Sequence, residues 1–265
     1  MPLFHLIVLA LVQGITEFLP VSSSAHLILV PHVTGWEDQG LLLDVAVHVG
    51  TLLAVMLYFW RDLWEMLRGA GLALRGKRTA GQRMIWHLIV ATVPAIIAGY
   101  LLHKYAGDML RSVEVIAWAT IGFGVLLYVA DRIGMTLRRI EHMTAGTALA
   151  LGLAQVLAFI PGASRSGVTM TAARFLGFER ADTARFSMLM SIPVIAGAGL
   201  LGALDLVKAG DASLTMDALI GAGLAFVSAL IAISLMMRWL RRASFTPFVI
   251  YRLLLGAALL ALIYL

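Results

Sequence analysis

Cysteine is absent from this chain of 265 residues, and charged residues make up only 13% of it. The absence of cysteine excludes disulfides, thiolate metal ligands, iron–sulfur clusters and a cysteine nucleophile. The scarcity of charge accompanies a hydrophobic content of 61% and a mean hydropathy of +0.93. A soluble domain of this length does not bury so much apolar surface. The composition therefore predicts an integral membrane protein whose chemistry uses oxygen and nitrogen side chains.

The features of a cleavable signal peptide are also missing. The N-terminal stretch MPLFHLIVLALVQG has no basic start and no small-residue cleavage site, so we expect it to remain in the mature protein. The net charge of +5 comes from basic residues in short loops between apolar runs. Membrane orientation explains such loops, because cytoplasmic loops retain Lys and Arg. We therefore expect no nucleic-acid partner.

Long apolar runs predict six transmembrane helices, because about 20 apolar residues cross a bilayer. The runs are 41–60, 86–102, 113–130, 187–206, 218–237 and 247–264. Two further apolar regions, 2–32 and 144–177, are interrupted by PVSSS at Pro20 and by PGASRSG at Pro161. The pieces that follow these interruptions are too short to cross a bilayer alone.

The distribution of Lys and Arg sets the orientation of the spans. We expect three basic loops in the cytoplasm and two segments with few basic residues outside. The basic loops are 61–85, 131–143 and 238–246, and the outer segments are 103–112 and 206–217. The orientation is consistent only if the two interrupted regions each enter and leave on one side of the membrane. The sequence thus predicts a single membrane domain over 1–265, an all-α polytopic bundle of six transmembrane helices plus two re-entrant helical hairpins. Two short spans over 144–177 are the alternative to a hairpin there, because they would also begin and end on one side.

The two hairpins would enter from opposite faces, which is typical of an inverted repeat. Aligning TEFLPVSSS with LAFIPGASR superposes Phe18 on Phe159, Pro20 on Pro161 and Ser23 on Ser164. The repeat halves would be approximately 1–135 and 136–265. Secondary transporters also use inverted repeats with broken helices, so this architecture alone does not select catalysis.

Each interruption predicts a new short helix, beginning near Ser22 and near Ser164, with its N-terminus inside the membrane. A helix N-terminus offers unpaired N–H groups and partial positive charge, and so binds anions such as phosphate. The serines could also be simple N-caps. Arg165 at membrane depth requires an anion. That anion is either a phosphate, which two guanidinium nitrogens would bind, or the carboxylate of Glu17 in a structural ion pair.

The first interrupted segment also carries candidates for metal binding and proton transfer. Gln13 and Glu17 are four residues apart and share a helix face. Their oxygens suit a hard cation, Mg²⁺ or Ca²⁺, although Gln13 could equally make an interhelical hydrogen bond. His26 lies one helical turn beyond Ser22 and three residues beyond Ser23. It is either a packing residue or an acid–base group for those hydroxyls.

Other polar residues in the apolar runs have a structural interpretation. Asp44 and His48 are one turn apart, where a mutual hydrogen bond suffices. Arg252 is near enough to the cytoplasmic end of its run to extend its charge to the membrane surface.

Two segments, QGITEFLPVSSSAH (Gln13 to His26) and PGASRSGVT (Pro161 to Thr169), resemble the signature motifs of bacterial undecaprenyl-diphosphate phosphatases of the bacitracin-resistance type. The similarity extends along the chain, including FWRDLW, FSMLMSIPVIAGA and SFTPFVIYRLLLG. The resemblance implies hydrolysis of undecaprenyl diphosphate to the monophosphate, which recycles the lipid carrier for peptidoglycan and other envelope polymers. It also implies a divalent cation and a site on the outer side of the bacterial inner membrane.

The resemblance assigns roles to residues of both motifs. The acidic motif falls on Gln13 and Glu17, the serines on Ser22 and Ser23, the histidine on His26, and the phosphate-binding segment on Ser164, Arg165, Ser166 and Thr169. The chain departs at Gln13, where many relatives have Glu, and at Ser24-Ala25, where Thr-Gly is common. With one carboxylate fewer, we expect the cation to be held mainly by Glu17 and the diphosphate itself.

Two routes to hydrolysis remain open from the sequence. Ser23 could attack the phosphoryl group, activated by His26, to give a phosphoserine that water resolves. Alternatively, His26 or Glu17 could orient water for direct attack. A transporter or flippase of a phosphorylated polyprenyl lipid is the alternative function, and the sequence leaves a homodimer open.

Overall fold

The computed structural model describes residues 2–37, 39–105, 112–209 and 212–264. These residues form a helical bundle without a β-strand among them, which confirms the predicted all-α class. The α-helices are α1 (Leu3–Thr16), α2 (Ser23–Thr34), α3 (Leu41–Tyr58), α4 (Trp60–Ala73), α5 (Ala80–Tyr105), α6 (Val113–Ile133), α7 (Ala145–Val156), α8 (Arg165–Phe175), α9 (Arg180–Ala209), α10 (Ala212–Leu240) and α11 (Thr246–Tyr264). Two short 3-10 segments, η1 (Ile140–His142) and η2 (Leu157–Phe159), flank α7.

Six helices are long and apolar enough to cross a membrane, namely α3, α5, α6, α9, α10 and α11. They coincide with the six predicted spans, so that prediction is confirmed. Some begin earlier than the apolar runs: α5 begins at Ala80 and α9 at Arg180. Hydropathy misses these first turns because they carry polar and charged residues that still continue the helix.

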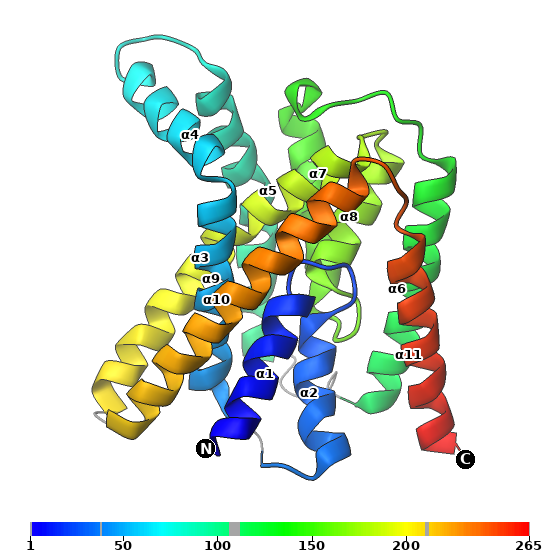
Figure 1. Cartoon of the computed structure of the whole chain (residues 1–265). Helices are drawn as coiled ribbons and strands as arrows, with labels where there is room; N and C mark the ends of the chain where they lie inside the picture. The colour runs from blue at the N-terminus through cyan, green and yellow to red at the C-terminus, as the bar shows by residue number, and fades with distance from the viewer. Residues whose placement is uncertain (1, 38, 106–111, 210–211, 265) are drawn as a thin grey trace.

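The helix α4 lies within the basic segment that the sequence analysis treated as a loop. Together with the first turns of α5 it projects from one end of the molecule (Figure 1). Trp60, Trp64 and Leu67 are exposed on it, and Arg61 and Arg68 lie among them. Exposed aromatic and apolar side chains beside arginines are typical of a helix that lies at a membrane surface.

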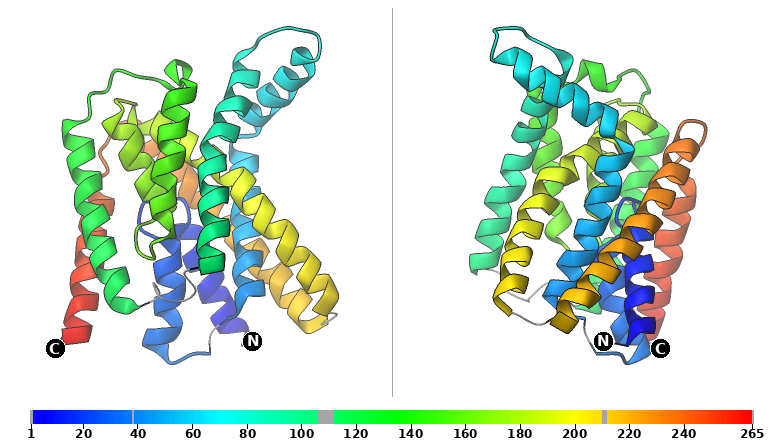
Figure 2. Two further views of the ribbon diagram at one scale, coloured as in Figure 1. Left: turned by 180° about the vertical axis from the view of Figure 1, so that it is seen from behind. Right: turned by 60° about the vertical axis from the view of Figure 1, so that its left-hand side comes forward.

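The long helices pack in pairs around the two interrupted regions. Contacts join α6 to α11 on one side of the bundle and α3 to both α9 and α10 on the other. Figure 2 shows α9 and α10 running obliquely across the molecule and meeting at the end opposite α4. The helix α1 packs on α10, and α7 packs on α5. Each interrupted region is therefore packed against long helices of the bundle.

Each interrupted region forms two short helices joined by a turn. The chain from α1 to α2 starts and finishes at the end of the molecule that carries the N-terminus, whereas α7 begins and α8 ends toward the opposite end (Figure 1). The turns that follow α1 and α7 lie in the middle of the bundle (Figures 1 and 2).

Both turns end on a serine with a left-handed backbone. Ser22, the N-cap of α2, has φ 73°, and Ser164, the N-cap of α8, has φ 71°; they are the only non-glycine residues with positive φ in the described chain. The sequence alignment had paired Ser164 with Ser23 instead. The difference arises because Ser164 is three residues beyond Pro161, whereas Ser22 is two beyond Pro20.

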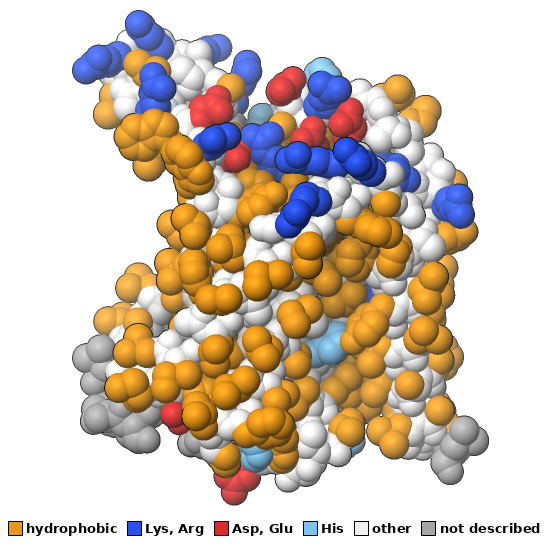
Figure 3. Space-filling view, in the orientation of Figure 1, with side chains coloured by type: hydrophobic (Ala, Val, Ile, Leu, Met, Phe, Trp, Pro, Cys, Tyr) orange, Lys and Arg blue, Asp and Glu red, His pale blue; other side chains and the backbone are white. Residues whose placement is uncertain are grey.

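The surface separates into charged and apolar zones. Figure 3 shows Lys and Arg gathered at the end that carries α4, above a broad apolar belt. Large apolar side chains are exposed on several long helices, including those of Ile96, Trp118, Leu200, Ile231 and Leu254. An apolar belt of this kind, around six helices of membrane-spanning length, is expected of a multi-pass membrane protein.

Candidate active site

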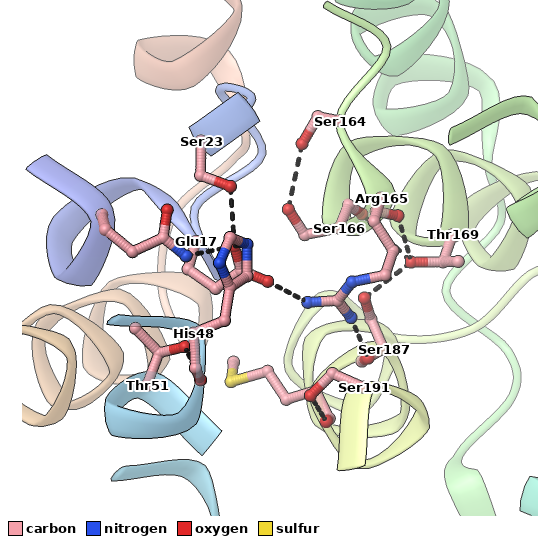
Figure 4. Close-up of polar contacts among 12 residues, drawn as sticks. Glu17, Ser23, His48, Thr51, Ser164, Arg165, Ser166, Thr169, Ser187 and Ser191 are labelled. Carbon is pink, nitrogen blue, oxygen red and sulfur yellow. Dashed lines mark hydrogen bonds and ion pairs between the residues drawn. The ribbon is translucent and has the colours of Figure 1, made fainter. Parts of the chain in front are cut away.

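The two turns meet through an ion pair at the centre of the bundle. Glu17 follows α1, and Arg165 is the first residue of α8. Although 148 residues separate them, Nη2 of Arg165 donates to Oε1 of Glu17 over 2.7 Å. The side chain of Glu17 is only 6% exposed, and that of Arg165 is 16% exposed. Figure 4 shows Glu17 and Ser23 on one side of the site facing Ser164, Arg165 and Ser166 on the other.

The carboxylate of Glu17 gathers several donors. Its Oε2 accepts from Oγ of Ser23 over 2.6 Å and from Nε2 of Gln13 over 2.9 Å. Nε2 of His48 lies 3.5 Å from the same oxygen. Because the Ser23 hydroxyl donates to a carboxylate, Glu17 is placed to take the proton of that hydroxyl.

Two helix N-termini contribute to the same pocket. Oγ of Ser22 accepts from the backbone N–H of Ala25 over 3.4 Å, and Oγ of Ser164 accepts from that of Gly167 over 3.1 Å. Ser22 and Ser164 therefore cap their helices, as the sequence predicted, and both also line the pocket. The remaining first-turn N–H groups of α2 and α8 have no partner within their own helix and suit an anion. Non-glycine residues with positive φ cost energy and are concentrated at functional sites.

Both polar and apolar residues line the pocket, and these two sets are called its polar wall and its apolar wall. The polar wall comprises Glu17, Ser22, Ser23, Ser24, Asp44, His48, Ser164 and Arg165. The apolar wall comprises Leu41 and Val45 of α3, Ala158, and Val194, Ile195, Ala198 and Gly199 of α9. Such a pocket suits a ligand with an anionic end and a hydrocarbon end.

Ser166 and Thr169, which the family resemblance assigns to phosphate binding, lie behind this pocket. Both are buried, at 1% and 2% exposure. Oγ of Ser166 donates to the carbonyl of Leu19 over 2.9 Å, across the two turns. Oγ1 of Thr169 donates to the carbonyl of Arg165 and lies 2.6 Å from Oγ of Ser187. The structure thus places both hydroxyls where they support the turns and Arg165.

His26 points away from Ser23. Its Nδ1 lies 2.7 Å from the carbonyl of Ser22, and its Nε2 lies 2.5 Å from the hydroxyl of Tyr251 in α11. Since a carbonyl only accepts, Nδ1 carries the proton, and Nε2 accepts from Tyr251 in the neutral ring. The structure does not bring the imidazole into hydrogen bonding with Ser23, because the ring bonds back to the cap residue and turns toward α11.

His48 is a residue of the pocket that the sequence analysis assigned only a structural role. Its Nδ1 bonds to the backbone carbonyl of Asp44 over 2.7 Å, and its Nε2 faces Glu17. Asp44 receives a hydrogen bond from the side chain of Gln39. The proximity of α3 to the first turn could not be read from local sequence. A histidine within a transmembrane run was the available indication.

The expectation that Arg252 extends to the membrane surface was wrong. Its side chain is fully buried, with 0% exposure. The guanidinium donates to backbone carbonyls instead, those of Pro20, Thr120, Gly162 and Ala163. Its position in the run allowed it to reach the surface, but the structure places it where it supplies donors to backbone carbonyls enclosed by the bundle.

The metal predicted for Gln13 and Glu17 can be tested against the donors present. Among the described residues, no group of three or more His, Asp or Glu side chains is arranged to hold a metal ion. However, Oε1 of Gln13 is buried without a hydrogen-bond partner. Amide and carboxylate oxygens are ligands that a hard cation prefers, but Gln13 directs Nε2 rather than Oε1 at Glu17 and is not among the residues that line the pocket. These two residues do not make a cage of protein ligands.

Comparison with known proteins identifies the family of this chain. The family described as bacitracin resistance protein BacA matches residues 6–258, which include both motifs. The chain belongs to the BacA family. The resemblance seen in the two motifs is thereby confirmed over nearly the whole chain.

Curated relatives align over their full or nearly full length. A protein of Ruegeria pomeroyi named undecaprenyl-diphosphatase is 56% identical, with 100% of each chain covered. One of Rhodospirillum rubrum named undecaprenyl-diphosphatase 1 is 53% identical, covering 100% of this chain and 96% of that protein. One of Roseobacter denitrificans named undecaprenyl-diphosphatase is 52% identical, with 100% of each covered. This member of the BacA family therefore resembles proteins of one stated activity along its entire length.

Proposed function

We propose that this protein is an undecaprenyl-diphosphatase, a hydrolase that converts undecaprenyl diphosphate to undecaprenyl phosphate and inorganic phosphate. The observation that carries the proposal is the convergence of the Ser23 hydroxyl, the Glu17 carboxylate and the Arg165 guanidinium at one pocket. The names of the full-length relatives agree with it. The product would return to the lipid-carrier pool for peptidoglycan and other envelope polymers.

The two walls of the pocket match the two ends of this substrate. The diphosphate would lie at the polar wall, between the N-termini of α2 and α8, with Arg165 as a two-pronged ligand of its terminal phosphoryl oxygens. The first isoprene units would lie along Val45, Val194 and Ala198, between α3 and α9. Phosphoryl transfer depends mainly on positioning and electrostatic stabilisation, which this arrangement supplies.

Ser23 is the proposed nucleophile. Its Oγ would attack the terminal phosphorus as its proton passes to Glu17, and the bond from phosphorus to the bridging oxygen would break, releasing undecaprenyl phosphate. Glu17 would pass this proton to the departing undecaprenyl phosphate and become a carboxylate again. Water would then attack the phosphoserine and give a proton to Glu17 as the bond from phosphorus to Oγ breaks. That proton would pass to Oγ, which regenerates the Ser23 hydroxyl and releases inorganic phosphate. The geometry supports Glu17 rather than His26 as the base, since Ser23 donates to Glu17. Direct attack by water oriented by Glu17 is the alternative.

A divalent cation, Mg²⁺ or Ca²⁺, belongs to the same proposal. Gln13 and Glu17 would hold it together with oxygens of the diphosphate. When bound, it supplies further neutralisation of phosphate charge. The buried, unpartnered Oε1 of Gln13 supports this assignment.

The membrane arrangement is also proposed. We infer that α1–α2 and α7–α8 are re-entrant hairpins of an inverted repeat with halves of about 1–135 and 136–265. Support comes from the shared left-handed serine caps and from the opposite directions of the two hairpins. The pocket involves Leu41, Val45 and His48, from the half of α3 farther from the basic end. If the basic end is cytoplasmic, the site faces the outer side of the inner membrane.

Release of inorganic phosphate tests the proposal. Purified protein in detergent is incubated with undecaprenyl diphosphate, with and without a chelator. Phosphate release that requires the divalent cation supports the phosphatase and its cofactor. A detergent solution has no separate compartments, so phosphate release measured there cannot result from transport. No release in detergent, together with lipid movement in vesicles, would favour the alternative, a flippase of phosphorylated polyprenyl lipid. A homodimer stays a prediction, to be tested by mass measurement in detergent.

A further inference from the structure

A single guanidinium in α11 contacts both turns of the active site. Nη1 of Arg252 donates to the carbonyl of Pro20 over 3.2 Å, in the first turn. Nη2 donates to the carbonyls of Gly162 and Ala163, over 2.9 and 3.1 Å, in the second turn. Nε donates to the carbonyl of Thr120 in α6 over 3.0 Å. One side chain therefore joins four backbone acceptors from three parts of the chain.

Burial of the Arg252 guanidinium costs free energy, so the structure around it must compensate for that cost. Arg252 is fully buried, and the ion pairs found among the described residues do not include it. All its hydrogen bonds described above are to neutral carbonyls, so its positive charge stays uncancelled. A buried, unpaired cation is unfavourable unless nearby dipoles or an anion stabilise it. The carbonyls of the turns supply dipoles, and a diphosphate in the adjacent pocket would supply an anion.

Two glycines make the space that the guanidinium occupies. A Cβ at Gly167, in the first turn of α8, would lie 2.7 Å from Nη1 of Arg252. A Cβ at Gly124, in α6, would lie 3.2 Å from the Cβ of Arg252. The guanidinium of Arg252 therefore lies directly behind the first turn of α8, whose N-terminus faces the pocket.

We propose that Arg252 is a positioning residue of the phosphatase site. It fixes the separation between the turn that bears Glu17 and Ser23 and the turn that bears Ser164 and Arg165. In-line attack needs the nucleophile on one turn and the phosphate ligand on the other to be held in register. The uncancelled charge of Arg252 also raises the positive potential behind the phosphate. This inference rests on the proposed function.

The variants Arg252→Lys and Arg252→Met test it. Lysine keeps the charge but cannot span both turns, because it lacks the planar fork of arginine. We expect kcat per folded molecule to fall about tenfold or more for both variants. We also expect affinity for inorganic vanadate, which mimics the transition state, to fall about tenfold more than affinity for inorganic phosphate. Calorimetric titration of both anions measures binding without turnover.

Arg174 provides a matched control. It is likewise buried, at 1% exposure, but its guanidinium bonds to Asp131 and to the carbonyls of Gly134 and Phe178, away from both turns. Arg174→Met should lower the melting temperature yet leave the ratio of vanadate to phosphate affinity unchanged. An equal change of this ratio in the Arg174 variant would overturn the inference.

Gly167→Ala keeps the inference testable if Arg252→Met does not fold. The added methyl group would displace Nη1 without removing charge, although it would also lie 3.1 Å from the Cβ of Ser164. We expect the same selective loss of vanadate affinity. Folded Arg252→Lys and Gly167→Ala proteins with the wild-type affinity ratio would contradict the inference. The proposed function fails separately, if the wild-type protein releases no phosphate from undecaprenyl diphosphate.

Discussion

The hydroxyl of Ser23 donates to Oε2 of Glu17 over 2.6 Å, across the turn between α1 and α2. The residue that begins the second helix thus contacts the carboxylate at the end of the first. Glu17 is held in turn by Arg165 from the other half of the chain. The hydrogen-bond partner of this serine hydroxyl is therefore a carboxylate, whereas His26 contacts Tyr251.

Ser23→Ala tests the nucleophile. If Ser23 is the nucleophile, we expect kcat to fall by at least about a thousandfold, because the variant lacks the hydroxyl that attacks and that Glu17 would deprotonate. Phosphate release is the measurement, and acid quenching of the wild-type enzyme should trap a phosphoserine. Ser234→Ala is the control, because that hydroxyl donates within its own helix to the carbonyl of Leu230. Undiminished turnover in Ser23→Ala would exclude the serine route and favour attack by water.

Arg165→Lys tests the phosphate ligand. Lysine retains the charge but lacks the fork that contacts two oxygens, so we expect kcat/KM to fall by about a hundredfold or more. Arg139→Lys, at an exposed ion pair with Glu179, should change kcat/KM little. Steady-state phosphate release from undecaprenyl diphosphate measures both. Full activity in Arg165→Lys would refute the phosphate role of Arg165.

His48→Gln tests the histidine that faces Glu17. Glutamine can still donate an amide hydrogen bond to the carboxylate, but its side chain is not an acid–base group. We expect kcat to fall about tenfold or more, as for a group adjacent to an acid–base residue. His5→Gln, on a ring stacked against Trp36, should be without effect. Equal turnover of the His48 and His5 variants would show that His48 only fills space.

Ala198→Trp tests the apolar wall. The larger side chain would occupy the space assigned to the first isoprene units, so we expect KM for undecaprenyl diphosphate to rise about fivefold or more, in line with lost apolar contact. Inhibition by inorganic phosphate should be unchanged, because phosphate does not use this wall. Leu201→Trp, at a site on α9 that is 65% exposed, is the control. Parallel weakening of phosphate inhibition would place the damage at the polar wall instead.

Gln13→Glu tests the cation site. A second carboxylate beside Glu17 should increase affinity for Mg²⁺, so half-maximal activity should need several-fold less cation. Activity is titrated with Mg²⁺ and with Ca²⁺ after removal of metal by a chelator. An unchanged cation requirement would mean that Gln13 does not take part in binding the cation.

The sequence predicted the spans, the two breaks and several residues that the structure brings together, such as Glu17, Ser23 and Arg165, but it missed His48 and many of the contacts. Apolar runs and prolines are local properties, so the spans and the capping at Ser22 and Ser164 could be read directly. The orientation of His26 depends on α11, and the approach of His48 to Glu17 depends on how α3 packs. The reach of Arg252 to Pro20 joins residues 232 positions apart. Contacts over such separations follow from packing, which local patterns do not contain.

The contacts of Arg252 also have a consequence for biogenesis. This arginine lies in α11, the last of the described helices, whereas Pro20 follows the first. In the proposed re-entrant arrangement, the turn after α1 would enter the membrane during synthesis long before this donor has been made. Its carbonyls must then rely on water or on the insertion machinery, because lipid offers no donors. We therefore expect a competent site to assemble only in the final stage of insertion.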